Sequence, residues 1–516
     1  MDLNADSLRY ILALKLRRLR QARGLGLKET AQAAGLSISY LSEIEKARKY
    51  PKPDKILQLA QAFGVPYDEL VSPKMDDELG PVGELFASPL LREFPFQLFG
   101  LEPESVVQLV SEAPSRAGAL LRTFLELGRT YDLRVEDFLF AALRSYQQMH
   151  GNHFPEIEKA ATSFLEARSW ERRLHLPEED LRRVLEEEHG YTVGTLPLER
   201  HPELADLRSV WLHEGGQPHV LINPRLRPAQ RAFALGRELG YLELGLEERS
   251  TTSVQLRVES FDQLVNDFQA AYFSGALLLH RELLVEDLGH FFARPRWSRD
   301  ALLDLLGRYR TTPETFFYRL SQLLPHEFGM ERLFFLRFSH RAGSEEYRLS
   351  KILNMTQLPI PLSVEPNEHY CRRWLSLRLL GEMPARRAGA RDERVGAQRS
   401  AFDSAGEEFL ILTLVRPLSL IDGVNSSISL GIGLDDAARR RIAFVDDASI
   451  AGRSVDLTCE RCPLADCGER VADPIVRLAR ERDERREAGV AALREELLGD
   501  AGAPPVTATP ASARPA

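Results

Sequence analysis

The stretch Gly35-Leu36-Ser37-Ile38-Ser39-Tyr40-Leu41-Ser42-Glu43-Ile44-Glu45 predicts a tight turn followed by a short amphipathic helix. Three apolar side chains are expected to face inward, namely Leu36, Leu41 and Ile44, and five polar ones outward, namely Ser37, Ser39, Tyr40, Ser42 and Glu43. The preceding segment 28–34 is rich in alanine, so a helix there can pack closely against its neighbour. Two helices joined by a short turn that contains glycine are typical of a helix-turn-helix motif.

The flanking sequence extends this pattern on both sides. Residues 8–23 predict a basic amphipathic helix with Leu12, Leu16 and Leu19 on one face. A basic loop follows at 46–53, then a helix over 56–63 and a last helical turn at 67–70. This five-helix pattern, over residues 7–72, resembles the lambda-repressor/Cro-like (XRE) DNA-binding domain.

The charge distribution agrees with DNA binding at this end of the chain. Residues 1–73 hold 12 Lys and Arg against 8 Asp and Glu, whereas the remaining residues hold 55 against 68. In a helix-turn-helix protein the second helix reads base edges in the major groove, while basic residues contact phosphates. The predicted base-reading residues are Ser37, Ser39, Tyr40, Ser42 and Glu43, and the predicted phosphate contacts are Arg17, Lys28, Lys46, Arg48, Lys49 and Lys52. One motif covers a short half-site, so we expect a homodimer or higher homo-oligomer on double-stranded DNA.

The totals bound the rest of the chain. A length of 516 residues suggests about three or four domains. Four cysteines are too few for a disulfide scaffold, and no apolar run approaches the ~18 residues of a membrane span. The first residues contain no apolar signal-peptide region, so we expect a cytoplasmic protein without membrane contact.

Changes in pattern divide the chain into predicted domains. We expect the DNA-binding domain at 1–73, a helical connector or dimerisation region at 74–174, and an α+β domain at 175–345. A C-terminal α+β (GAF-like) effector domain follows at 346–472, with a charged helix and a disordered tail at 473–516. The fold class is therefore multidomain, mainly α with α+β parts.

The domain at 175–345 begins with three predicted strands, at 190–193, 209–212 and 219–223, followed by helices at 228–242 and 261–279. This order resembles the ImmA/IrrE family of metallopeptidase-like domains, which carries His-Glu-x-x-His on the first helix and an acidic ligand on the second. Here the motif reads Arg237-Glu238-Leu239-Gly240-Tyr241, and Asp267 is the candidate acidic residue. Arginine keeps its proton and cannot ligate a metal, so we expect a peptidase fold without zinc. The cationic Arg237 then fits either an anionic ligand or a neighbouring carboxylate.

The C-terminal domain contains the second distinctive pattern. Strands are expected at 408–415, 427–434 and 441–445, and an Arg/Gly/Ala-rich mobile loop between 386 and 399. Three cysteines follow in the order Cys459-x2-Cys462-x4-Cys467, and Cys371 lies in the same domain. Clustered thiolates hold zinc or an iron–sulfur cluster, and spacing alone does not choose between them. Inert buried thiols are the alternative.

Taken together, the order of domains resembles the short-chain fatty-acyl transcriptional regulator family. Its marks here are Ser39-Tyr40-Leu41, Glu314-Thr315, Arg319-Leu320-Ser321, Leu323, Ser350-Lys351, Cys371-Arg372-Arg373-Trp374 and the cysteine triplet. The resemblance implies a transcription factor of propionate, acetate or glyoxylate metabolism, with a short-chain acyl-CoA effector and a Cys₄ [4Fe–4S] cluster. Phosphates of an acyl-CoA need Arg or Lys, and the candidates are Arg237, Arg319, Arg337 and Lys351.

Two other functions fit parts of the sequence. One is an ImmA/IrrE-like zinc peptidase that cleaves a repressor, which would need a metal at Glu238. The other is a stress or phage-type repressor that responds to a protein partner. We expect a regulator that is not an enzyme, because Arg237 and Tyr241 stand where the peptidase needs histidines.

Overall fold

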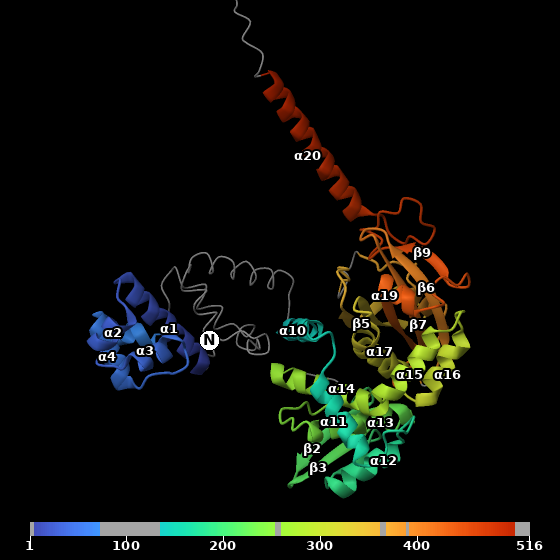
Figure 1. Ribbon diagram of the computed structural model, residues 1–516, viewed down its shortest axis with the longest axis horizontal. Coiled ribbons are helices and arrows are strands. Elements are labelled where there is room, and N and C mark those ends of the chain that lie inside the picture. Colours follow the sequence, from blue (N-terminus) through green and yellow to red (C-terminus); the bar gives the residue numbers. More distant parts are fainter. Residues whose placement is uncertain are drawn as a thin grey trace, which may run out of the picture. The chain divides into compact units, whose positions relative to one another are not determined.

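The computed structural model describes residues 5–72, 135–252, 258, 260–361, 368–388 and 392–500. The chain divides into two compact units, one of Met1–Leu283 with Tyr309–Thr311, the other of Leu284–Arg308 with Thr312–Ala516 (Figure 1). Residues 74–134 of the helical connector expected at 74–174 lie outside the described residues. The multidomain fold class, helical at the N-terminus and α+β toward the C-terminus, is confirmed.

Five helices form the N-terminal domain, as the sequence predicted: α1 (Ala5–Ala22), α2 (Leu27–Ala33), α3 (Ile38–Glu45), α4 (Pro53–Phe63) and α5 (Tyr67–Val71). The inward residues of α3 are Leu41 and Ile44, which are fully buried, while Leu36 packs at the edge of the same core. Gly35 makes the turn between α2 and α3 with φ +64°, a left-handed conformation that disfavours residues with a Cβ. Ser37 then caps α3, because its hydroxyl accepts a hydrogen bond from the Tyr40 amide.

A buried ion pair joins α1 to α3. Arg20 donates from Nε and Nη2 to both carboxylate oxygens of Glu45, at 2.8 to 3.1 Å. The Glu45 side chain is only 5% exposed and that of Arg20 15%. A bidentate guanidinium–carboxylate pair fixes orientation as well as distance, so it sets how α3 projects from the domain.

The first unit continues with α10 (Val135–Met149), α11 (Pro155–Glu166) and α12 (Glu178–Arg183), which a short π-helix at Val184–Glu188 extends. A small sheet has the order β1-β3-β2, with β1 (Thr192–Thr195) parallel and β2 (Ser209–Glu214) antiparallel to β3 (Gln217–Ile222). Two long helices complete it: α13 (Pro228–Glu243) and α14 (Phe261–Leu278). These strands and helices agree with the sequence-based assignment, and a 3₁₀ turn at Pro202–Leu204 separates β1 from β2.

Two glycines let α13 and α14 approach closely. A Cβ on Gly236 would lie 2.6 Å from the Ser274 Oγ, and one on Gly240 would lie 2.8 Å from the Ala270 carbonyl oxygen. Neither contact leaves room for a methyl group. Because Gly236 and Gly240 each precede a residue of the Arg237–Tyr241 motif, this contact brings that motif against α14.

The second unit contains most of α15 (Arg281–Phe292), then α16 (Arg299–Tyr309) and α17 (Pro313–Phe328), which Thr312 caps. Its sheet has the order β5-β4-β8-β7-β6-β9 and is antiparallel except for the β6–β9 pair. The strands are β4 (Leu333–Arg341), β5 (Tyr347–Asn354), β6 (Arg394–Phe402), β7 (Glu407–Pro417), β8 (Val424–Gly433) and β9 (Ala451–Val455).

Helices cover both faces of this sheet. The α18 helix (Leu375–Gly381) packs on the face that carries Phe334, Leu336 and Phe338. Phe335 points to the opposite face, where Tyr318 of α17 meets it edge to face at a centroid distance of 5.3 Å. This arrangement agrees with the GAF-like α+β prediction.

Three sequence-based details need correction. The segment 441–445 is not a strand: α19 (Asp436–Arg441) ends there, and Phe444 packs on Phe291, Phe292 and Trp297. Residues 394–399, expected in a mobile loop, belong to β6, whose burial alternates along the strand. The domain boundary placed at 345/346 falls inside the β4–β5 hairpin, since the pairing of β4 with β8 cannot be read from local sequence.

The charged helix expected near the C-terminus is α20 (Ile475–Asp500), and its side chains are mostly exposed. Among the described helices, none is both long and apolar enough to cross a membrane.

The Arg20–Glu45 pair predicts a localised loss of stability. Arg20→Met leaves the Glu45 carboxylate buried without its cation, so the opening free energy of α1 and α3 should fall by about 2–4 kcal/mol. Native-state hydrogen exchange on the full chain measures it. The control is Arg48→Ala, which breaks an exposed 3.5 Å pair with Glu43 and should cost less than about 0.5 kcal/mol. Equal effects would contradict the assignment.

Candidate functional site

The N-terminus of α3 presents the predicted base-reading residues. Ser37 and Ser39 are exposed, whereas Tyr40, Ser42 and Glu43 are half-buried. The Ser37 and Ser39 hydroxyls lie 3.3 Å apart, so both are at the first turn of the helix. A helix with short polar side chains at its N-terminus can enter a major groove and bring donors and acceptors to base edges.

Basic side chains surround this helix. Five of the predicted phosphate contacts are exposed, namely Lys28, Lys46, Arg48, Lys49 and Lys52, and Arg17 is half-buried. Arg48 lies 3.5 Å from Glu43, so these two predicted DNA contacts also contact each other. Exposed cations of this kind are suited to phosphate contact, which would hold α3 in position.

An ionic network links α13, α14 and the segment that follows α13. The Asp267 carboxylate on α14 accepts three hydrogen bonds. The donors are the Tyr241 hydroxyl, the Ser250 hydroxyl at 2.7 Å and the Arg237 guanidinium at 3.3 Å. Glu238, with a side chain 4% exposed, pairs with Arg249 from the segment after α13. Each of the two acidic residues therefore forms an ion pair with an arginine.

These residues do not fit a zinc ion. The positions one helical turn apart on α13 hold a guanidinium and a phenol, and neither supplies the neutral imidazole that zinc requires. Arg237 pairs with the carboxylate that the sequence offered as a third ligand. Of the two expectations for Arg237, the carboxylate partner is the one observed.

Burial controls the protonation of Asp267. Desolvation raises its pKa from 3.8 to about 6, while the nearby charge of Arg237 acts in the opposite direction. The pKa of this carboxyl thus lies closer to neutral pH than that of an exposed aspartate.

All four cysteines line one small cavity of about 10 Å³, together with Arg372, Arg373, Leu464, Glu469 and Arg470. Cys371, Cys459 and Cys462 are buried and Cys467 is half-buried. Burial raises the pKa of Cys371 to about 11 and raises that of Cys462 as well. Cys371 thus lies beside the triplet, although about ninety residues separate them in the sequence.

The donor set of this cavity fits a thiolate-bound metal group. Four sulfurs are the ligands of both Cys₄ zinc and iron–sulfur clusters, and Arg470 is close enough to donate to the Cys459 carbonyl at 2.9 Å. Within the described ranges, no three His, Cys, Asp or Glu side chains are placed to hold a metal ion. The thiols therefore share a cavity without surrounding a single ion position.

The four cations predicted to bind the effector do not form one group. Arg237 belongs to the first unit and the other three to the second. Arg337 and Lys351 are cross-strand neighbours on β4 and β5, and both pair with Glu314 of α17, at 3.4 and 3.6 Å. Arg319 is 1% exposed and donates to Gln322 within α17.

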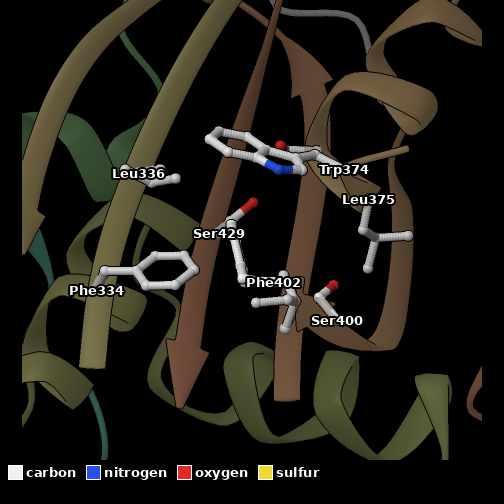
Figure 2. A pocket seen from close by; sticks show the side chains of 9 residues that line it. Phe334, Leu336, Trp374, Leu375, Ser400, Phe402 and Ser429 are labelled. Carbon is white, nitrogen blue, oxygen red and sulfur yellow. The ribbon is translucent and has the colours of Figure 1, made fainter. Parts of the chain in front are cut away.

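A second cavity of about 20 Å³ lies between the sheet and α18. Figure 2 shows its apolar wall, formed by Phe334 and Leu336 of β4 with Trp374, and the hydroxyls of Ser400 and Ser429 beside it. Its remaining lining residues are Leu375, Ser376, Phe402 and Ile411. Gly431 makes room for the Phe334 ring, because a Cβ there would lie 2.3 Å from it.

Sequence reasoning missed this cavity and the role of Arg249. The cavity is assembled from four strands and one helix whose pairing is long-range, so no local motif marks it. Arg249 lies in an irregular segment, and only its distance to Glu238 identifies it. One signal was available: Trp374 directly follows the Cys371-Arg372-Arg373 motif.

The raised pKa of Asp267 predicts a specific pH dependence. The folded protein binds this proton more tightly than the unfolded chain, so the contribution to stability is complete below pH 3.8 and is lost as pH rises through about 6. In the wild type the free energy of unfolding should fall by about 2–3 kcal/mol between these two pH values, and Asp267→Asn should abolish this fall. Hydrogen exchange of α13 and α14 amides, corrected for intrinsic rates, measures it. The exposed Asp262→Asn is the control, and an unchanged slope in Asp267→Asn would contradict the prediction.

Comparison with known proteins identifies two domains. Residues 11–72 match the helix-turn-helix domain model, and residues 186–321 match the IrrE N-terminal-like domain model. The propionyl-CoA carboxylase regulator of Cereibacter sphaeroides is 22% identical over 92% of this chain and 96% of its own length. The regulator RamB of Mycobacterium tuberculosis is 26% identical over 50% of this chain, which spans 56% of RamB.

A shorter relative matches the DNA-binding domain. The helix-turn-helix transcriptional regulator y4dJ of Sinorhizobium fredii is 36% identical over 14% of this chain and 95% of its own length. These findings agree with the helix-turn-helix geometry of α2 and α3 and with the domain order predicted from the sequence. The chain therefore belongs to the helix-turn-helix transcriptional regulators, and its XRE-type DNA-binding domain is followed by an IrrE-like domain.

Proposed function

We propose that this regulator controls short-chain acyl-CoA metabolism, of propionate, acetate or glyoxylate, in response to an acyl-CoA effector. It would act as a cytoplasmic homodimer or higher homo-oligomer on paired operator half-sites. The observation that carries the effector part is the cavity between α18 and the sheet, because its apolar wall and adjacent hydroxyls suit a small acyl group. A relative named for propionyl-CoA carboxylase aligns along nearly the whole chain, which supports the metabolic assignment.

The lining of the cavity suits a short acyl chain. Its wall is aromatic and aliphatic, but its free volume of about 20 Å³ holds about one water molecule, so the wall would have to move apart to admit an acyl group. Ser400 and Ser429 supply hydroxyls that can bond a thioester carbonyl. Gln398 Oε1 is buried without a hydrogen-bond partner, although its amide nitrogen donates to Ser400, so one more polar atom lies beside this hydroxyl.

The structure favours other cations for the acyl-CoA phosphates than those named from the sequence. Arg337 and Lys351 are neighbours on the face opposite to the cavity wall formed by Phe334 and Leu336, because residues alternate along β4. Arg372 and Arg373 instead adjoin Trp374, which lines the cavity. We therefore favour Arg372 and Arg373 for the anionic part of an acyl-CoA.

The cysteine cavity would hold a [4Fe–4S] cluster, with zinc as the alternative occupant. Cys371, Cys459, Cys462 and Cys467 would be its ligands, as the four thiols line one cavity. Such a group would supply a redox-active or structural link between the segment at Cys371 and the segment at 459–467. Residues 371–373 line the cysteine cavity and residues 374–376 line the apolar cavity. Binding of a metal and binding of an effector would therefore act on adjacent parts of one segment.

Anaerobic purification tests the metal assignment. A cluster predicts a brown protein with about four iron and four sulfide per chain, and zinc predicts a colourless protein with about one zinc. Cys462→Ser should lose the metal, because it removes a buried ligand candidate. Glu238→Gln is the matched control and should keep it, since Glu238 belongs to the other unit. A wild-type protein with neither metal would contradict the assignment.

Operator binding tests the effector assignment. DNA fragments selected from the genome with the purified protein are used in gel-shift assays with acetyl-, propionyl- and octanoyl-CoA. A short acyl-CoA should change operator affinity, since an effector acts through its different affinities for two states. Ser376→Leu fills the cavity and should weaken the acyl-CoA response at least about tenfold.

The control for this variant is on the same helix. Arg378 is 32% exposed and pairs with Glu382, so Arg378→Leu leaves the cavity unchanged. Both variants should bind the operator alone like the wild type. A wild-type protein that binds its operator but ignores every acyl-CoA would refute the effector while leaving DNA binding intact.

A further inference from the structure

The guanidinium of Arg249 lies between two aromatic rings. Its Cζ is 4.1 Å from the ring centroid of Trp211 and 4.1 Å from that of Tyr241, well inside the range of cation–π contact. Nη2 of the same group donates to the Glu238 carboxylate. The Arg249 side chain is 8% exposed, so this cation is almost completely removed from water.

The walls around Arg249 belong to regular elements. Trp211 lies on β2, while Glu238 and Tyr241 are on α13, fixed against α14 by Gly236 and Gly240. Tyr191, just before β1, is also near, since the charge of Arg249 opposes the burial that raises the pKa of its phenol. Two ring faces with a buried carboxylate between them form a cage for a flat cation, and sheet and helix build this cage.

Backbone and side-chain contacts hold Arg249 in place from its own segment. The Trp211 amide donates to the Thr251 carbonyl at 2.8 Å, and Val210 forms a β-bridge with Thr252. The neighbouring Ser250 hydroxyl donates to Asp267. The segment that carries Arg249 therefore lies along β2 and places the arginine in the cage.

We propose that the cleft of the IrrE-like fold is a guanidinium-binding site, and that its resident ligand is the chain's own Arg249. The ligand class is an alkylguanidinium, because a planar cation can stack on both rings while its edge donates to Glu238. Arg237 and Arg249 supply two positive charges opposite Glu238 and Asp267, so cation and carboxylate charges are equal in number. This site is independent of any acyl-CoA effector.

Removing the resident side chain tests the proposal. In the full chain, Arg249→Ala leaves a buried carboxylate and an empty cage, so Tm should fall by about 5 °C or more. Added methylguanidinium chloride, at constant chloride concentration, should raise the Tm of this variant with saturation and change Trp211 fluorescence. The wild type should not respond, since its cage is filled. Methylammonium chloride should have little effect, because an ammonium cannot stack on both rings.

A matched variant controls for general effects of the cation. Arg168 also combines a cation–π contact, 3.8 Å from the Phe164 centroid, with an ion pair to Glu188, but Glu188 is half exposed. Arg168→Ala should gain nothing from methylguanidinium. No saturable response in Arg249→Ala, or an equal response in Arg168→Ala, would overturn the proposal.

A double variant covers the case in which Arg249→Ala does not fold. Glu238→Gln with Arg249→Ala removes the buried charge along with its partner, so the fold should persist. Methylguanidinium should still change its fluorescence through the two rings, with weaker affinity than an ionised cage would give. The change must disappear when Trp211→Phe is added. A folded double variant with no fluorescence response would equally refute the guanidinium site.

Discussion

The first unit depends on the neutralisation of two buried carboxylates. Gly236 and Gly240 draw α13 against α14, and this contact places Glu238 and Asp267 in one cleft. Buried carboxylates without a cation would be strongly unfavourable. In a zinc-containing relative of this fold the metal would supply the positive charge, whereas here Arg237 and Arg249 supply it. Two side chains thus supply the positive charge that these buried carboxylates need.

An arginine pair differs from a zinc ion in the chemistry it can support. Zinc activates water because it is a dication with an open coordination position. A guanidinium has no such position, and its donors are used by the carboxylate it neutralises. Glu238 accepts from Arg249, so it is not available as a base toward an attacking water. The regulatory assignment and the composition of the cleft therefore agree.

The sequence predicted those features that depend on local pattern. The five N-terminal helices and the strand–helix order of residues 190–279 both follow from short-range spacing. What failed or was missed depends on long-range contact: Phe444 is buried by α15 without strand pairing, and Arg249 acquires its role only beside Trp211. Arg337 and Lys351 could be named as cations, but their shared partner Glu314 could not be predicted from spacing.

One short segment of the C-terminal unit, Cys371–Ser376, contributes to the walls of two cavities. Cys371, Arg372 and Arg373 line the thiol cavity, and the next three residues line the apolar cavity. The Trp374 indole donates to the Asp456 carbonyl at 2.7 Å, and the Cys371 amide donates to the Leu457 carbonyl at 3.1 Å, so this segment is also tied to the strand leading to Cys459. A displacement of Cys371 on metal binding would therefore be transmitted to the Trp374 wall. Close packing makes such a coupling short and direct, since little free space remains to absorb it.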